Sequence, residues 1–233
     1  ANIYTGATTV SAGTVTISNA TALGDDGSTR SSTTVSSGAA VSISGGITVT
    51  EPFTIVGTGV SSTGAVVSTS GNNSVTGLVT LSGNATVGNS ATISTFTFDV
   101  ASGSSFTSTA TPELTFAGAG DFSIKDAIIS PIASLKKQGT GTITLEGANT
   151  YTGATTVDAD GGNFLITGTG SLGSLSSGTR TYSGNITITS ATSTFTYDSS
   201  TNQTLSGTIS GAGTLKKTTS ESSRLRLTGT NSS

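Results

Sequence analysis

The chain repeats its own sequence over a long interval. Residues 2–10 read NIYTGATTV and residues 149–157 read NTYTGATTV, so eight of nine positions agree. The hexapeptides STFTFD and STFTYD also recur, in the same order, farther along each half. Such self-similarity is expected of stacked-repeat folds, in which each unit contacts its neighbours along one axis. It divides a single domain into two unequal modules, about residues 1–147 and 148–233.

Short runs within each module alternate apolar and polar residues, as in residues 14–18 (TVTIS) and 142–145 (TITL). Strict alternation predicts strands with one buried face. Glycine-rich clusters such as residues 44–46 (SGG) and 82–84 (SGN) separate the runs and predict turns. Because the runs are very short, repeat along the chain and carry Thr or Ser on the polar face, they favour an all-β solenoid. An antiparallel β-sandwich of short strands remains the alternative fold.

Residues 122–137 (FSIKDAIISPIASLKK) interrupt this pattern. The segment has no glycine and is the most apolar stretch of the chain. We interpret it as a lateral segment, either a longer loop or a short helix packed on the flank of the solenoid. Pro131 argues against one uninterrupted helix. A docking surface for a partner is the alternative interpretation.

The composition removes most kinds of reactive site. With neither histidine nor cysteine, the chain has no Ser-His-Asp triad, no imidazole base, no His or Cys metal ligands and no disulfides. Carboxylates remain at Asp25, Asp26, Asp158 and Asp160, and oxygen ligands of this kind suit Ca²⁺ or acid–base hydrolysis. All four lie near glycines, where Asp is chiefly a turn former. We therefore expect no enzyme and no cofactor, and keep these four residues only as weak Ca²⁺ candidates.

The charge pattern limits the partners. The net charge is −3, and the nine basic residues include only two adjacent pairs, Lys136-Lys137 and Lys216-Lys217, which we expect to be solvated. A nucleic-acid surface needs clustered Lys and Arg, so no nucleic-acid partner is expected. No apolar stretch approaches the roughly 18 residues of a membrane span, so no membrane insertion of this segment is expected.

Residues 139–157 (GTGTITLEGANTYTGATTV) resemble the autotransporter-associated β-strand repeat, also called the passenger-associated transport repeat. Residues 33–73 resemble the spacers that lie between such repeats. The resemblance covers most of the chain, and residues 122–135 are its clearest departure. It implies a right-handed parallel β-helix, an extracellular or bacterial cell-surface location, and no catalytic residues to carry over.

The two ends of the chain complement each other. Residues 225–233 followed by residues 1–7 rebuild the motif found intact at residues 145–154, with a few extra residues. Two interpretations follow: a unit of a longer tandem array, or copies that join head to tail as a filament. The residues expected at such a junction are Ala1, Asn2, Ile3, Tyr4, Leu225, Leu227 and Asn231.

The aromatic residues are expected to pack rather than to bind. Phe96 and Phe98, like Phe195 and Tyr197, alternate along predicted strands and should form stacks in the core. Tyr4 and Tyr151 occupy the same repeat position and should pack over a turn.

Three functions remain open from the sequence. The first is an extracellular structural solenoid that forms a surface fibre from copies of itself. The second is the passenger stalk of an adhesin, for which a carbohydrate or host surface is the partner. The third is an ice-binding solenoid, which requires Thr-X-Thr at a fixed register on successive coils.

Overall fold

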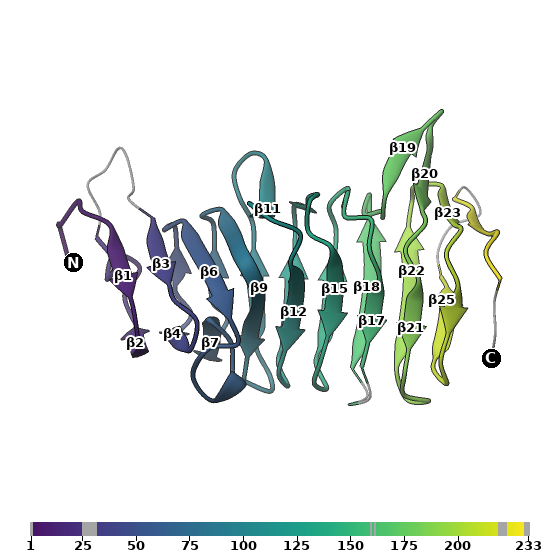
Figure 1. The fold of residues 1–233 in the computed structure, drawn as a ribbon. Helices are drawn as coiled ribbons and strands as arrows, with labels where there is room; N and C mark the ends of the chain where they lie inside the picture. The colour runs from purple at the N-terminus through teal and green to yellow at the C-terminus, as the bar shows by residue number, and fades with distance from the viewer. Residues whose placement is uncertain (1, 25–31, 159, 161, 219–222, 231–233) are drawn as a thin grey trace.

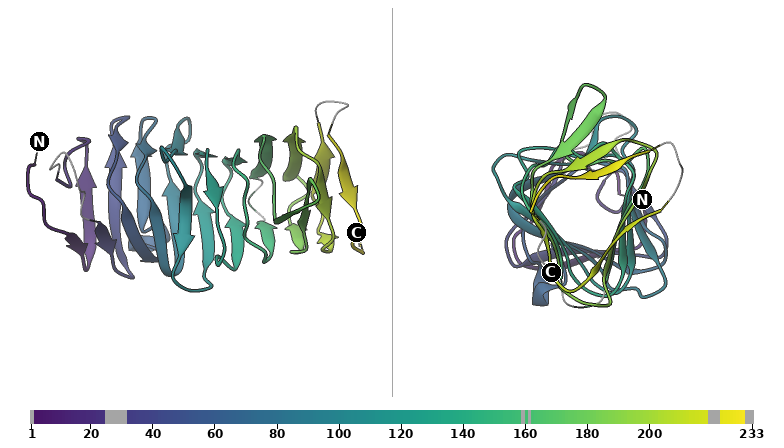
Figure 2. Two further views of the ribbon diagram at one scale, coloured as in Figure 1. Left: turned by 90° about the horizontal axis from the view of Figure 1, so that it is seen from above. Right: turned by 90° about the vertical axis from the view of Figure 1, so that its right-hand side faces the viewer.

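The computed structural model describes residues 2–24, 32–158, 160, 162–218 and 223–230. Successive coils of the chain stack along one long axis from the N-terminus to the C-terminus (Figure 1). Viewed from one end, the coils surround a common centre (Figure 2). Strand pairs in the described part are parallel except one, so the predicted β-solenoid is confirmed and the antiparallel sandwich is excluded.

The largest sheet has 14 strands and runs nearly the whole length of the stack. Its main path is β1-β3-β6-β9-β12-β15-β17-β21-β24, in which each strand comes from the next coil. Its strands are β1 (Thr8–Val10), β2 (Gly13–Ile17), β3 (Thr33–Val35), β4 (Ala39–Ser44), β6 (Phe53–Gly57), β7 (Val66–Ser70), β9 (Val79–Asn89), β11 (Ser104–Ser108), β12 (Glu113–Ala117), β14 (Ala127–Ile128), β15 (Ser134–Lys137), β17 (Thr155–Val157), β21 (Ile186–Ile188) and β24 (Ile209–Ser210).

Two further sheets complete the coils. The second sheet has eight strands: β5 (Thr48–Val49), β8 (Ser74–Val75), β10 (Thr95–Phe98), β13 (Asp121–Ile124), β16 (Thr142–Leu145), β18 (Asn163–Gly168), β22 (Thr194–Ser199) and β25 (Thr214–Lys217). The third has four: β19 (Ser174–Ser176), β20 (Thr179–Tyr182), β23 (Gln203–Leu205) and β26 (Leu225–Leu227). A short 3-10 helix, η1 (Val60–Ser62), lies between β6 and β7. The antiparallel β19–β20 hairpin projects from the stack (Figures 1 and 2).

Alternation along each strand fills the core. In the second sheet Phe96 lies in register with Phe122 and Phe164 with Phe195, and all four side chains are buried. The rings of Phe164 and Phe195 stack with centroids 4.9 Å apart and 7° between their planes. Phe98 and Tyr197 are buried as well, so the predicted aromatic stacks are confirmed. The rest of the core consists mostly of Val, Ile and Leu, and the buried rings are its largest side chains.

Residues 122–137 do not form the predicted lateral loop or helix. They form β13, β14 and β15, which pair in parallel with strands of neighbouring coils. The apolar character of the segment has a simple cause, because Phe122, Ile124, Ile128 and Leu135 are buried in the solenoid core. The same side chains cannot serve as an exposed docking surface.

Glycines stacked at one corner let successive coils approach closely. A Cβ atom on Gly184, Gly207 or Gly229 would lie 2.1, 2.2 or 2.1 Å from the carbonyl oxygen of the glycine one coil earlier. The earlier glycines are Gly153, Gly184 and Gly207, respectively. Because real atoms do not approach so closely, a side chain at these positions would separate the coils. The recurring glycines of the sequence are therefore a packing requirement as well as turn formers.

Candidate functional site

The second copy of the repeated segment lies inside the stack and joins one coil to its neighbours. The Asn149 side chain accepts a hydrogen bond from the backbone N–H of Ile128 at 2.9 Å on the preceding coil. Its Nδ2 atom donates to the carbonyl oxygens of Gly147 at 2.8 Å and Ser171 at 3.1 Å. Asn149 is buried, and these bonds satisfy both ends of its amide. One side chain thus connects backbone groups of three successive passes of the chain.

A buried hydroxyl cluster follows Asn149. Tyr151 and Thr155 share a hydrogen bond at 2.8 Å, and Thr155 shares another with Tyr182 at 2.7 Å. Tyr182 also donates to the carbonyl oxygen of Gly153. Burial is the main reason that the pKa values of Tyr151 and Tyr182 lie well above the ordinary tyrosine value. Both phenols therefore stay protonated and act as structural hydrogen-bond donors.

The first copy has the same residues but lies at the edge of the described coils. Asn2 donates from Nδ2 to the carbonyl oxygen of Ala22 at 2.7 Å, the counterpart of the bond from Asn149 to Ser171. Ile3 is 83% exposed and Tyr4 is 41% exposed. Ala1, also expected at a junction, lies outside the described residues. No described coil precedes this copy, so these side chains have nothing to pack against on that side.

The opposite edge shows the same pattern. Leu225 is partly buried against the core, whereas Leu227 is 42% exposed. Both lie on β26, the last strand of its sheet, while Asn231 lies outside the described residues. A further coil would cover the exposed edge, whether it came from a longer chain or from a second copy. The structure thus places the described junction residues, Asn2, Ile3, Tyr4, Leu225 and Leu227, at two opposite edges and does not bring them together.

A set of corner asparagines was not predicted as functional from the sequence. In each case the side-chain oxygen accepts a hydrogen bond, at 2.9 or 3.0 Å, from a backbone N–H of the following coil. The pairs are Asn72 with Thr95, Asn84 with Glu113, Asn163 with Thr194, Asn185 with Thr208, and Asn202 with Arg224. In the sequence, an asparagine beside each predicted turn was the only sign of these residues. It indicates a turn but does not indicate a hydrogen bond between coils.

Lys137 corrects the expectation that both lysine pairs are solvated. It is 1% exposed, on a row of inward-facing residues between Phe116 and Val157. Its Nζ atom donates to the carbonyl oxygens of Gln138 at 2.5 Å and Gly139 at 2.9 Å. The ammonium group of the side chain therefore lies at a corner of the coil, while the methylene groups lie in the core. Burial lowers the pKa of Lys137 to about 8.

The acidic residues act in local structure. Asp158 forms an ion pair with Lys136 at 3.0 Å and accepts a hydrogen bond from Gln138 at 3.2 Å. Asp160 accepts one from the backbone N–H of Gly139 at 3.0 Å. Asp25 and Asp26 lie outside the described residues. Within the described ranges no three acidic side chains gather as a set of metal ligands.

The Thr-X-Thr segments alternate with other residues along the second sheet. Those of β10 and β16 are separated by β13, whose Asp121 lies in register with Thr95. Between β16 and β22, Asn163 lies in register with Thr142 and Leu165 with Thr144. The threonine rows are therefore interrupted on every second coil, unlike the continuous array on which the ice-binding hypothesis depends.

The passenger-associated transport repeat family model matches residues 1–17 and 135–161, which contain the two copies of the repeated segment. No curated protein and no solved structure matches the chain. Among the described residues, no helix combines the length and the apolar character that a membrane-spanning helix needs.

Proposed function

We propose that this chain, which carries two passenger-associated transport repeats on a parallel β-solenoid, is a rigid spacer within an autotransporter-type passenger at a bacterial surface. The spacer holds other parts of the passenger away from the cell. The main support is the continuous parallel ladder from β1 to β24. Each coil adds one strand to this ladder, so the fold extends the chain along one axis.

The spacer role is supported by how the coils are joined. Corner asparagines, stacked glycines and the buried Tyr151–Thr155–Tyr182 cluster all connect one coil to the next. A stack whose coils are joined by three sheets and by corner side chains resists bending more than one joined by a single sheet. Because strands of successive coils lie about 4.8 Å apart, every added coil lengthens the rod by that amount.

We further propose that the chain is not an enzyme. The carboxylates available for acid–base chemistry, Asp158 and Asp160, are held in an ion pair and a backbone hydrogen bond. The chain contains no histidine or cysteine to take their place.

Rod length tests the spacer role. Residues 138–157 span one coil without the projecting hairpin, because Leu135 to Lys137 lie in register with Thr155 to Val157. Three extra tandem copies of this coil should lengthen the particle by about 14 Å in small-angle X-ray scattering, without changing its cross-section. A control with the same residues in scrambled order should not produce this extension. A particle that thickens or stays the same length on adding true coils would contradict the proposal.

Surface location is tested separately. The chain is expressed in a Gram-negative host between a secretion signal with an epitope tag and an outer-membrane barrel. Protease added to intact cells should remove the tag. A tag that stays protected although the barrel has inserted would contradict the surface role.

End-to-end assembly into a fibre is a second candidate, favoured by the exposed Ile3, Tyr4 and Leu227 at opposite edges. These edges expose apolar side chains and unpaired strand backbone, which promote pairing. Electron microscopy of the purified chain should then show filaments, and Tyr4→Lys with Leu227→Lys should reduce them to short rods. Short rods from the unmodified chain at high concentration would exclude this candidate.

A further inference from the structure

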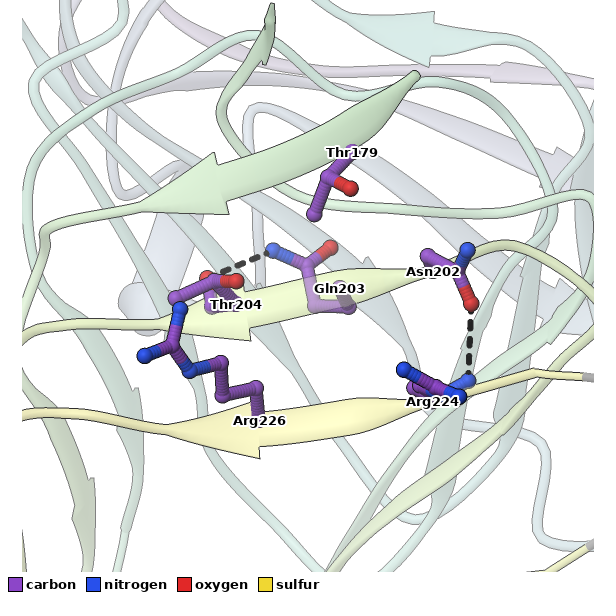
Figure 3. Close-up of a pocket in the computed structure, with 6 residues that line it drawn as sticks. All are labelled: Thr179, Asn202, Gln203, Thr204, Arg224 and Arg226. Carbon is purple, nitrogen blue, oxygen red and sulfur yellow. Dashed lines mark hydrogen bonds between the residues drawn. The ribbon is translucent and has the colours of Figure 1, made fainter. Parts of the chain in front are cut away.

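A polar groove lies on the outer face of the third sheet, beside the β19–β20 hairpin. Its volume is about 240 Å³, and it is lined by Thr179, Asn202, Gln203, Thr204, Arg224 and Arg226. Figure 3 shows that these residues lie on, or directly before, three neighbouring strands, with Arg226 reaching from β26 toward Thr204 on β23. Asn202 also joins two coils as a corner asparagine, whereas the side chains of Arg224 and Arg226 take no part in the coil junctions described above.

Two arginines face the groove, one from β26 and one from the residue directly before it. Arg224 and Arg226 flank Leu225, which packs against the core, so alternation places both guanidinium groups on the outer face. Both residues are exposed, and no carboxylate within the described ranges pairs with either. Elsewhere Lys125 pairs with Glu146 and Lys136 with Asp158. The cations at this groove are therefore available to an external anion.

The surrounding sequence strengthens the positive charge. Residues 162–233 contain five basic and two acidic residues, whereas residues 1–161 contain four basic and ten acidic residues. The C-terminal coils thus carry a net positive charge on a chain that is acidic overall. Such an asymmetry attracts an anionic ligand to one end of the rod and repels it from the other.

Neutral hydrogen-bonding groups lie beside the arginines. The oxygen of the Asn202 side chain accepts the backbone N–H of Arg224 at 2.9 Å, which fixes the amide orientation. Its Nδ2 atom and the hydroxyls of Thr179 and Thr204 make no hydrogen bond within the described residues. The groove therefore offers two guanidinium groups and several neutral hydrogen-bond donors and acceptors.

We propose that this groove binds an anionic polysaccharide through its carboxylate or sulfate groups. The planar guanidinium fork of Arg224 or Arg226 matches these oxyanions in bidentate geometry. Asn202, Thr179 and Thr204 hydrogen-bond the neighbouring sugar hydroxyls. Nucleic acid fits less well, because no aromatic side chain lines the groove for base stacking and the protein is acidic overall.

Binding is measured by biolayer interferometry with immobilised heparin (sulfated), hyaluronate (carboxylated), dextran (neutral) and duplex DNA, at about 50 mM salt. The unmodified chain should bind heparin or hyaluronate, with weaker binding as salt increases, and should not bind dextran. The Arg224→Gln/Arg226→Gln double variant should lose about tenfold or more in affinity, because charge-assisted hydrogen bonds are removed. Whichever of heparin and hyaluronate binds more tightly identifies the oxyanion.

The matched control is Lys125→Gln/Lys216→Gln, which removes two exposed positive charges on other faces of the rod. It should keep the affinity of the unmodified chain, and both double variants should keep its melting temperature. Equal loss in the two double variants would show non-specific charge attraction and overturn the proposal. Absence of polysaccharide binding, or tighter binding to DNA than to either polysaccharide, would overturn it as well. None of these outcomes bears on rod length or surface location, so the spacer role is tested independently.

Discussion

The two copies of the repeated segment differ at one position in nine but occupy very different environments. Tyr151 is fully buried, whereas Tyr4, at the same repeat position, is 41% exposed. A Cβ atom on Gly153 would lie 1.3 Å from the carbonyl oxygen of Ala133, whereas one on Gly6 would meet no atom within 4 Å. The difference arises from the preceding coil, which is described for the second copy only.

This comparison shows which residues of the repeated segment contact the preceding coil and which contact the following coil. Asn2 forms its hydrogen bond to Ala22 although no described coil precedes the first copy. The contact of the repeated segment with the following coil therefore does not require a preceding coil. The acceptor role of Asn149 and the close approach at Gly153 both involve the preceding coil. The repeated segment is therefore a two-sided joint, and only one side of it is engaged in the first copy.

Gly153→Ala against Gly6→Ala gives the largest expected contrast. The methyl group at residue 153 would overlap the backbone of Ala133, and a backbone carbonyl cannot rotate away as a side chain can. We expect Gly153→Ala to lower the free energy of unfolding by about 4 kcal/mol or more, and Gly6→Ala by less than about 1 kcal/mol. Urea denaturation followed by circular dichroism measures both. Similar losses for the two variants would show that the motif is not a two-sided joint.

Tyr151→Ala against Tyr4→Ala should give the next largest contrast. Removing the buried ring at residue 151 leaves a cavity beside Tyr182, whose ring centroid lies 5.6 Å from that of Tyr151. The expected loss is about 3–5 kcal/mol for Tyr151→Ala and about 1 kcal/mol for Tyr4→Ala. If the chain assembles end to end, the Tyr4→Ala loss should grow with protein concentration, because a second copy would then bury that ring.

The sequence was sufficient to predict the fold but not the two environments. Alternation and repetition predicted strands, coils and inward aromatic rings, because these depend on local periodicity. Lys137 was misjudged because a lysine looks solvated in sequence, while its place between Phe116 and Val157 depends on the register between neighbouring coils. The Arg224–Arg226 groove was missed for the same reason, since three strands far apart in sequence form it.

The pH dependence of the free energy of unfolding tests the coil that precedes the second copy, which contains Lys137. Because the pKa of Lys137 is about 8 in the folded protein and 10.5 is the ordinary value, the unfolded chain binds more protons between these pH values. Stability should therefore rise by about 2 kcal/mol from pH 8 to pH 10. Above pH 10 it should fall, because unfolded tyrosines ionise while Tyr151 and Tyr182, with raised pKa values, stay protonated. Urea denaturation across this pH range measures both slopes.

Lys137→Met supplies the control for that profile. The variant keeps an unbranched side chain of similar length in the core and removes the titrating ammonium group. It should be more stable than the unmodified chain at pH 7 and should lose the rise between pH 8 and pH 10. A rise of unchanged size in the variant would assign the effect to another group.

Asn149→Ala against Asn2→Ala gives the smallest contrast and the most direct one. Alanine at residue 149 leaves the buried backbone N–H of Ile128 and the carbonyl of Gly147 without their side-chain partner, at an expected cost of about 2 kcal/mol. Alanine at residue 2 removes one exposed bond, to Ala22, and should cost less than about 0.5 kcal/mol. Hydrogen exchange sharpens the result, because Asn149→Ala should speed exchange at Ile128 while Asn2→Ala leaves it unchanged. Unaltered protection of Ile128 in Asn149→Ala would mean that the strands of the two coils, and not the asparagine, hold this corner.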